Sequence, residues 1–553
     1  MNRRFCFVLA SVTASLSLVV ALAGCRTSSD RYGLHELGVS RQQVHEVEPL
    51  ELKKAEPNEA PPESNQPPEK IELSLEQSRA MALGNNLQLK TALISPAIAG
   101  AQLSAEEARF EASFFANASL LETDQPQGRA IFLDGILVPA IGTSQIERIQ
   151  GDFGVRVPLR TGGTVTFDLV DTQTENLKVT APFNPAFENN AILSLSQPLL
   201  RNAGRRATMY SIRVAAYNRD ITDARTKLEV MTVLASLDKV YWRLYAARRE
   251  LEVRQQQYGL AQAQLDRARR LVAGGQRAQV ETIRAEAGVA QQLEAIIVAE
   301  NNLRDREREI KRVVHKAGLD VQTATIVIPT TEPDPVRYEL DRPRLVGTAI
   351  EGRMELLELQ LQLLQDASSI DFARNQTLPL ATLNYTYSIN GTGETRTDSL
   401  DMLAGTDFTT HSVGLQVVIP IGNEAAKSRL RQAIYQRRQR LATRANREDL
   451  IRLEVLNAAD QVEANWQRIL AARQTSVLNG RLYEAEQRQF EQGMRTSTDV
   501  LDAQTKFADA QSAEIRALAD YQISLVDVAY ATGTLLGSAK VEWAPIIPEN
   551  DVE

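Results

Sequence analysis

The sequence predicts a mainly α protein with a smaller β part, in which long antiparallel coiled helices are joined to strands of the transmembrane β-barrel type. Three observations support this fold class. Apolar residues recur every seven positions in a very long segment before residue 275, as they do in coiled helices. Other segments alternate with a period of two, as strands do. A glycine turn between two long helical segments occurs twice, at Gly275 and Gly493, which indicates an internal two-fold repeat.

Composition excludes several classes of function. Aromatic residues are only 5% of the 553-residue chain, which favours elongated helices over a series of globular domains. The net charge of −8 argues against a nucleic-acid partner. The 4 histidines show no ligand spacing, and a mature chain that keeps only Cys25 can form no internal disulfide, so we expect no metal and no cofactor. No catalytic triad order or phosphate-binding loop is present, and we predict no catalytic residue and no enzyme activity.

The N-terminus carries an export signal. Arg3 and Arg4 precede a short apolar segment, so residues 1–24 are predicted to be a signal peptide. The segment ends in Leu-Ala-Gly-Cys, which resembles the bacterial lipoprotein box and predicts lipidation at Cys25. The alternative is an ordinary signal peptide with an incidental cysteine. Residues 25–70 are polar and rich in proline, as an extended tether would be.

The first repeat is assigned to residues 71–335. Ser74 is predicted to cap a helix that breaks at Asn85–Asn86, and a second helix, interrupted or bent at Pro96, follows to about residue 110. Strands are predicted at about 112–121, 152–159, 164–172 and 191–199, with long polar loops at 122–150 and 176–190. This pattern fits a transmembrane β-barrel, and the strands alone also fit a soluble β-sandwich. Long helices are predicted at about 205–272 and 279–316, on either side of the first glycine turn.

The second repeat is assigned to residues 336–537, followed by a tail at 538–553. Strands are predicted at about 378–389 and 411–421 with a polar loop between them, then a helix at 424–492, the second glycine turn and a helix to 531. The two turns are 493 − 275 = 218 residues apart, whereas the opening helices, compared at Ala82 and Ala349, are 349 − 82 = 267 apart. The first half is therefore longer by 267 − 218 = 49 residues, which predicts one additional strand hairpin there.

Asp499 and Asp502 are the candidate functional residues. They lie three residues apart at the start of the helix after Gly493, which places both carboxylates on one helical face. Carboxylates in the first turn of a helix can simply stabilise its dipole. They can also form charged rings where several copies of a chain meet around an axis.

The segment Gly493-Met494-Arg495-Thr496, continuing to Asp499-Val500-Leu501-Asp502-Ala503, closely resembles the tip of TolC-type outer-membrane efflux channels. The lipoprotein box points to the lipidated branch of that family. The resemblance implies a homotrimer, with a β-barrel in the outer membrane and a hollow α-barrel across the periplasm. It implies that Asp499 and Asp502 form the pore gate, where close like charges would raise some pKa values and favour cations.

The resemblance also implies roles for the residues around both tips. Arg495 and Glu281 match the positions of a salt bridge that holds the channel shut. Phe490 departs from the family pattern because it lacks a hydroxyl group, and Val280 lacks a polar one. The positions that would contact a periplasmic adaptor protein are Gly275, Gln276, Gly493, Met494 and Arg495.

The function that follows is a passive exit duct of the bacterial outer membrane, in a tripartite efflux or type I secretion system. The implied partners are two further copies of the chain, a periplasmic adaptor, an inner-membrane pump and outer-membrane lipid. The alternative is a non-conducting coiled-coil lipoprotein with a structural role in the cell envelope. That alternative explains the lipid anchor and the helices, but it gives no reason for membrane strands or for acidic residues after the tip.

Overall fold

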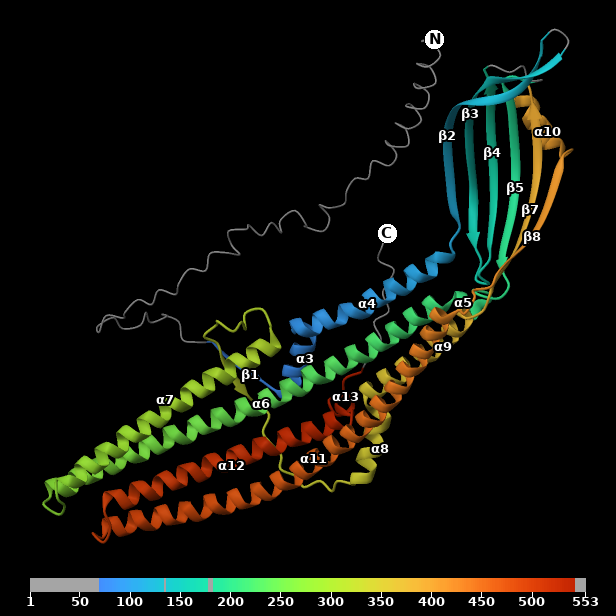
Figure 1. The fold of residues 1–553 in the computed structure, drawn as a ribbon. Helices are drawn as coiled ribbons and strands as arrows, with labels where there is room; N and C mark the ends of the chain where they lie inside the picture. Colours follow the sequence, from blue (N-terminus) through green and yellow to red (C-terminus); the bar gives the residue numbers. More distant parts are fainter. Residues whose placement is uncertain (1–68, 134–135, 178–182, 543–553) are drawn as a thin grey trace, which may run out of the picture. The chain divides into compact units, whose positions relative to one another are not determined.

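The computed structural model describes residues 69–133, 136–177 and 183–542. Figure 1 shows a sheet of long strands and a set of very long helices. The predicted signal peptide, Cys25 and nearly all of the predicted tether lie outside the described residues, as do positions 543–553 of the tail.

Two helices open the described chain. α3 (Leu75–Asn85) begins at the predicted cap, where Ser74 Oγ accepts a hydrogen bond from Gln77 N–H at 3.2 Å. α4 (Leu87–Glu107) runs without interruption through Pro96 and ends in a short 3-10 turn, η3 (Ala108–Phe110). Proline leaves the carbonyl of Ala92 without its helical donor, and the Thr226 hydroxyl donates to that carbonyl at 3.4 Å. The predicted interruption is therefore wrong, because a side chain from a neighbouring helix satisfies the free carbonyl.

A six-stranded antiparallel sheet follows the order β2-β3-β4-β5-β7-β8. Its strands are β2 (Ser113–Leu133), β3 (Ile136–Pro158), β4 (Thr164–Asn176), β5 (Ala186–Pro198), β7 (Leu380–Gly393) and β8 (Thr409–Val418). The additional hairpin predicted in the first half thus joins the same sheet as the others. Figure 1 shows the strands side by side.

One face of this sheet is apolar across all six strands. Directly paired residues of an antiparallel ladder share a face, so the register assigns the sides. On β7 the apolar face extends from Ala381 to Ile389, roughly 27 Å at about 3.4 Å per residue. Its side chains are Phe114, Ala116, Ala118, Leu120, Phe153, Val155, Val157, Val165, Phe167, Leu169, Ala191, Leu193, Leu195, Leu383, Tyr385, Tyr387, Ile389, Val413, Leu415 and Val417. We call this set the apolar band.

The opposite face is mostly polar. Across it Asn117 donates to Asp152 at 2.6 Å, and Ser196 donates to Asn384 at 2.8 Å. A sheet with one apolar and one polar face separates lipid from water when it closes on itself.

Two segments predicted as loops form regular structure instead. Residues 122–133 and 136–150 extend β2 and β3 into a long ribbon, because ladder hydrogen bonds between two strands need no apolar alternation. The polar stretch between β7 and β8 contains α10 (Arg396–Gly405), started by a capping box between Thr395 and Asp398. α10 packs against β7, where Gly391 leaves room for it: a Cβ there would lie 2.1 Å from the carbonyl oxygen of Ser399.

Four long helices form the second part of the fold. They are α6 (Tyr210–Ala273), α7 (Val280–Val314), α11 (Glu424–Glu491) and α12 (Ser497–Ala531), close to the predicted bounds. The 64 residues of α6 give a length of about 96 Å. α6 packs against α7 and α12, and α11 packs against α12 (Figure 1). Within the described residues, no helix combines the length and the apolar character needed to cross a membrane.

The predicted seven-residue seam of α6 faces its neighbours. Leu237, Leu244, Ala261 and Ala268 are fully buried. Arg254 stands between Ala247 and Ala261 in the second of two predicted seams and pairs with Asp509 of α12 at 3.0 Å. Apolar stripes and ion pairs between helices therefore hold the two hairpins together.

Short elements complete the described chain. β1 (Lys70–Leu73) pairs in parallel with β6 (Ile326–Pro329), a two-stranded sheet that sequence analysis missed. The remaining helices are α5 (Arg205–Thr208), α8 (Arg342–Gly352), α9 (Met354–Gln376) and α13 (Leu535–Ser538). The largest core cluster lies here, where β1 and β6 cover α6 and α7.

Candidate functional site

Two glycine turns of the same geometry end α6 and α11. Gly275 and Gly493 have φ angles of +70° and +82°, which favour glycine because a Cβ would be strained there. After α6, Gln276 N–H donates to the Leu271 carbonyl at 2.9 Å, and after α11, Met494 N–H donates to the Gln489 carbonyl at 3.0 Å. Both turns are therefore Schellman caps, which reverse the chain directly after a helix. We call them the first tip and the second tip.

Asp499 closes a capping box at the start of α12. Its Oδ2 accepts hydrogen bonds from Thr496 N–H at 2.9 Å and from the Thr496 hydroxyl at 2.8 Å. These bonds, the one from the backbone N–H foremost, lower the pKa of Asp499 below its ordinary value. Asp502 is exposed and pairs with Lys506 at 3.2 Å. In the single chain Asp499 therefore stabilises a helix start, and the pore role of the two aspartates stays a prediction.

Within the described chain, the predicted partners Arg495 and Glu281 do not pair with each other. Arg495 Nε lies 3.1 Å from Glu486 Oε2. Glu281 pairs with Arg284 at 2.7 Å, and its Oε2 accepts the Ser497 N–H at 2.7 Å. A salt bridge between Arg495 and Glu281 thus stays a prediction for contacts between two copies of the chain.

Glu281 nevertheless joins the two tips. It is 6% exposed and accepts one of the first free N–H groups of α12, where the helix dipole favours a negative charge. Burial alone would raise the pKa of Glu281. The bond from Ser497 N–H and the charge of Arg284 outweigh burial, and the pKa is lowered. The carboxylate therefore stays ionised and binds most strongly in that form.

Arg277 is the second link between the tips, and sequence analysis missed it. Its Nη2 donates to the carbonyls of Phe490 and Arg495, both at 3.0 Å. Its guanidinium lies 5.0 Å from the centre of the fully buried Phe490 ring. The only sequence signal was positional: 277 + 218 = 495, so Arg277 corresponds to Arg495 under the offset that relates the two tips.

The first tip thus contacts both helix ends of the second tip. A cation, Arg277, binds the Phe490 carbonyl at the end of α11 and the Arg495 carbonyl in the turn that follows, and an anion, Glu281, binds an N–H at the start of α12. Each side chain has a charge opposite to the partial charge of the helix end that it contacts. We call Arg277 and Glu281 the tip latch.

Above the tip latch the interface between the hairpins is polar. Gln257 of α6 and Gln504 of α12 are fully buried, and Gln504 Nε2 donates to the Gln257 carbonyl at 2.7 Å. Each of the two glutamines has a side-chain oxygen with no partner among the described residues. A buried polar atom without a partner costs about 1–3 kcal/mol, so this layer weakens the packing between the hairpins.

Comparison with known proteins agrees with this architecture. The family profile described as "Outer membrane efflux protein" matches residues 164–314 and 345–534, more than half of the chain. This chain belongs to the outer membrane efflux protein family. The outer membrane protein TolC of Salmonella enteritidis is 24% identical over 357 residues, which are 63% of this chain and 70% of that protein.

Solved structures of efflux channels share the fold. The Campylobacter jejuni CmeC outer membrane channel aligns with a TM-score of 0.59 at 17% identity, covering 83% of this chain and 86% of that one. The open-state MtrE outer membrane channel of Neisseria gonorrhoeae aligns with a TM-score of 0.58 at 16% identity, covering 83% of this chain and 89% of its own. These relatives are channels.

The family match leaves out the first strands of this efflux protein. It begins at Thr164, the first residue of β4, so β2 and β3 lie outside it. It includes both long hairpins almost completely. In the second tip the matched segment contains Arg495, Asp499 and Asp502, whereas in the first it contains Arg277 and Glu281.

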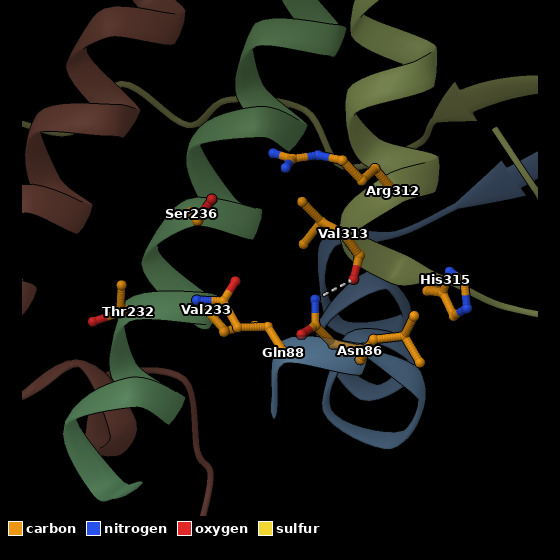
Figure 2. A pocket seen from close by; sticks show the side chains of 9 residues that line it. Asn86, Gln88, Thr232, Val233, Ser236, Arg312, Val313 and His315 are labelled. Carbon is orange, nitrogen blue, oxygen red and sulfur yellow. Dashed lines mark hydrogen bonds between the residues drawn. The ribbon is translucent and has the colours of Figure 1, made fainter. Parts of the chain in front are cut away.

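A pocket in this efflux protein lies away from the two tips. It measures about 430 Å³ and lies where the start of α4 meets α6 and the end of α7. Figure 2 shows Asn86 reaching the Val313 carbonyl, a bond of 2.8 Å, and the same side chain caps α4. Arg312 and His315 line the pocket and are exposed. Among the described residues no group of three or more potential ligands could hold a metal ion.

Proposed function

We propose that this protein is the outer-membrane exit duct of an efflux or type I secretion system, made of three copies of the chain. The observation that carries the proposal is one sheet with a continuous apolar band, joined to two long helical hairpins whose tips are linked. Open sheet edges cannot lie in lipid, so the sheet needs further copies to close. The non-conducting envelope lipoprotein is not favoured, since it leaves the apolar band unexplained and the relatives are channels.

The two halves of the chain, we infer, are copies of one ancestral unit. The matching Schellman caps at Gly275 and Gly493 and the corresponding positions of Arg277 and Arg495 support this inference. Three copies of two hairpins each would form a ring of hairpins, and their helices would line a tunnel through the periplasm. Cys25 would carry the lipid that anchors the chain to the outer membrane.

The tips would receive a periplasmic adaptor, which in turn couples the duct to an inner-membrane pump. Gly275, Gln276, Gly493, Met494 and Arg495 are all exposed, as an adaptor site requires. Met494 is 64% exposed and offers an apolar contact at the second tip. The polar Gln276 at the first tip would contact the adaptor through hydrogen bonds.

The gate, in this proposal, consists of Asp499 and Asp502 from three copies around the pore axis. Asp502 is exposed and free to face the axis, whereas Asp499 also holds the capping box. Lys506 lies one turn after Asp502 and would partly neutralise its ring. A salt bridge from Arg495 to Glu281 of a neighbouring copy would add to the tip latch, which closes the gate from within each chain.

Planar bilayers test the duct directly. The purified trimer should conduct ions and show cation block from the side of the tips. A trimer that inserts stably and carries no current would refute the proposal and favour the structural lipoprotein.

The gate is tested with the double variant Asp499→Asn and Asp502→Asn, which keeps the shape of both side chains. Cation block should weaken by at least tenfold, because the ring charge is removed. The matched control is Asp509→Asn, an exposed carboxylate farther along α12 that pairs with Arg254. Equal cation block in the double variant and the control would show that Asp499 and Asp502 do not form the gate.

A further inference from the structure

We propose that the β2–β3 hairpin is part of the membrane wall, so that each copy contributes six strands and β2 pairs with β8 of a second copy. The inference rests on the proposed trimer and specifies how its sheet closes. Three copies would then give a barrel of 3 × 6 = 18 strands.

The hairpin is an addition to the repeating unit. Within the described chain the second half supplies two strands to the six-stranded sheet, β7 and β8, and the first half supplies four. The segment from Ser113 to Gly163 has 163 − 113 + 1 = 51 residues, close to the 49 extra residues that the two offsets require. The family match begins at Thr164, so it leaves out this segment together with α3 and α4. The strand count and the agreement in length thus identify β2 and β3 as the additional strands.

The additional strands are built as membrane strands. β3 pairs with β4 without a break from Pro158↔Thr164 to Ile146↔Asn176. In this register Phe153 and Val155 lie on the same face as the apolar residues of β4. A shift of one residue would turn that whole set to the polar face. A hairpin that served as an external lid or a plug would have no need to match the apolar band in register.

Both free edges of the sheet are exposed, and the 10 residues of β8 can pair along part of the 21 residues of β2. β2 and β8 are the two ends of the sheet, and each has one neighbour within the described chain. All ten residues of β8 are exposed, and Val413 and Leu415 are 71% and 64% exposed. Phe114 of β2 is also 71% exposed. Lipid cannot form hydrogen bonds with the backbone groups of a free edge, so each edge must pair with another strand. The strand available to β2 is β8 of another copy of the chain, and the strand available to β8 is β2 of another copy.

An 18-stranded wall has a consequence for transport. With strands about 4.8 Å apart and tilted by about 40°, the barrel would be roughly 36 Å across between backbones. Side chains about 5 Å deep on each side would leave roughly 25 Å of open width. Barrels of this class enclose a water-filled passage and do not sieve small solutes. Bulky polar cargo could therefore leave through the sheet, and selection would fall to the tips.

Engineered cysteines on the polar face test the seam. Asn117→Cys in β2 is combined in turn with Thr410→Cys, Ser412→Cys or Gln416→Cys in β8, because the register between copies is not fixed by one chain. The matched series places the first cysteine at Thr166 of β4, which would lie about 14 Å, or three strand spacings, from β8 of the next copy. Disulfides need Cα atoms within about 7 Å. The unsubstituted chain serves as the oxidation control.

The expected result is that oxidised trimers of at least one Asn117→Cys combination become covalent dimers and trimers, whereas the Thr166→Cys series does not. Cross-links in the Thr166→Cys series alone, or in neither series, would overturn the inference. As a second measurement, electron cryo-microscopy of the unmodified trimer should resolve 18 wall strands, and a wall of 3 × 4 = 12 strands would overturn it too. A trimer that forms but does not conduct would count against the proposed duct and leave the seam standing.

Discussion

Replacing Arg277 with alanine removes one side of the tip latch. The change deletes two hydrogen bonds from a charged donor, to the carbonyls of Phe490 and Arg495, and one contact with the Phe490 ring. For a half-exposed guanidinium we take about 1 kcal/mol for each bond and about 0.5–1 kcal/mol for the ring contact. The sum, about 2.5–3 kcal/mol in each copy of the chain, stabilises only the state in which the tips touch. Arg277→Ala should therefore raise the ratio of open to closed states by ~60- to 150-fold for each copy that opens.

Single-channel recording in planar bilayers measures that ratio as the fraction of time spent open. Arg277→Lys should fall between the variant and the wild type, because an ammonium group keeps the charge but cannot stack on the ring in the same way. The matched control is Arg269→Ala, which removes an exposed ion pair with Glu286 inside the first hairpin. An open fraction for Arg277→Ala no higher than that of Arg269→Ala would refute the tip latch.

Three further predictions concern the same region. The folded-state pKa of Glu281 is depressed, so the stability that its carboxylate gives to the closed tips is complete above the ordinary value of 4.5 and is lost as pH falls through the lower folded value. Acidification should therefore open the wild-type channel. Glu281→Gln should conduct more at pH 7 and lose that component of the pH response. Lys506→Gln should strengthen cation block several-fold, since it removes the charge beside Asp502; unchanged block would place Asp502 away from the axis. Gly493→Ala should destabilise the trimer by roughly 1–2 kcal/mol, because a Cβ is strained at this left-handed position, and should lower its thermal midpoint. Gly259→Ala, inside α6, should stabilise the trimer by about 0.5–1 kcal/mol and raise the midpoint. Shifts of the midpoint in the same direction would contradict the role given to the turn.

The sequence predicted the long helices well, because their signals are local and repeated. Heptad spacing identified α6 from Leu237 onward, and glycine marked both chain reversals within a residue or two. The ribbon formed by residues 122–133 and 136–150 was missed, since its sequence shows no regular alternation of polar and apolar residues. α10 was missed although its capping box was visible, because the surrounding glycine, threonine and aspartate are typical of loops.

The candidate site was predicted only in part for a similar reason. Thr496 and Asp499 have the spacing of a capping box, and that local bond is what the single chain shows. Arg277 binds backbone carbonyls 213 and 218 residues away, and a carbonyl leaves no mark in a sequence. Glu281 was named for a salt bridge with Arg495, which stays a prediction, and its contact with the second tip is likewise with a backbone group, Ser497 N–H. Contacts of side chains with distant main chain lie beyond pattern reasoning.

The apolar band also determines how this protein must be made. In the proposed trimer, a copy that has not yet assembled would expose this apolar surface together with two unpaired strand edges, and both can bind other chains. Copies that accumulate before they assemble are therefore expected to aggregate.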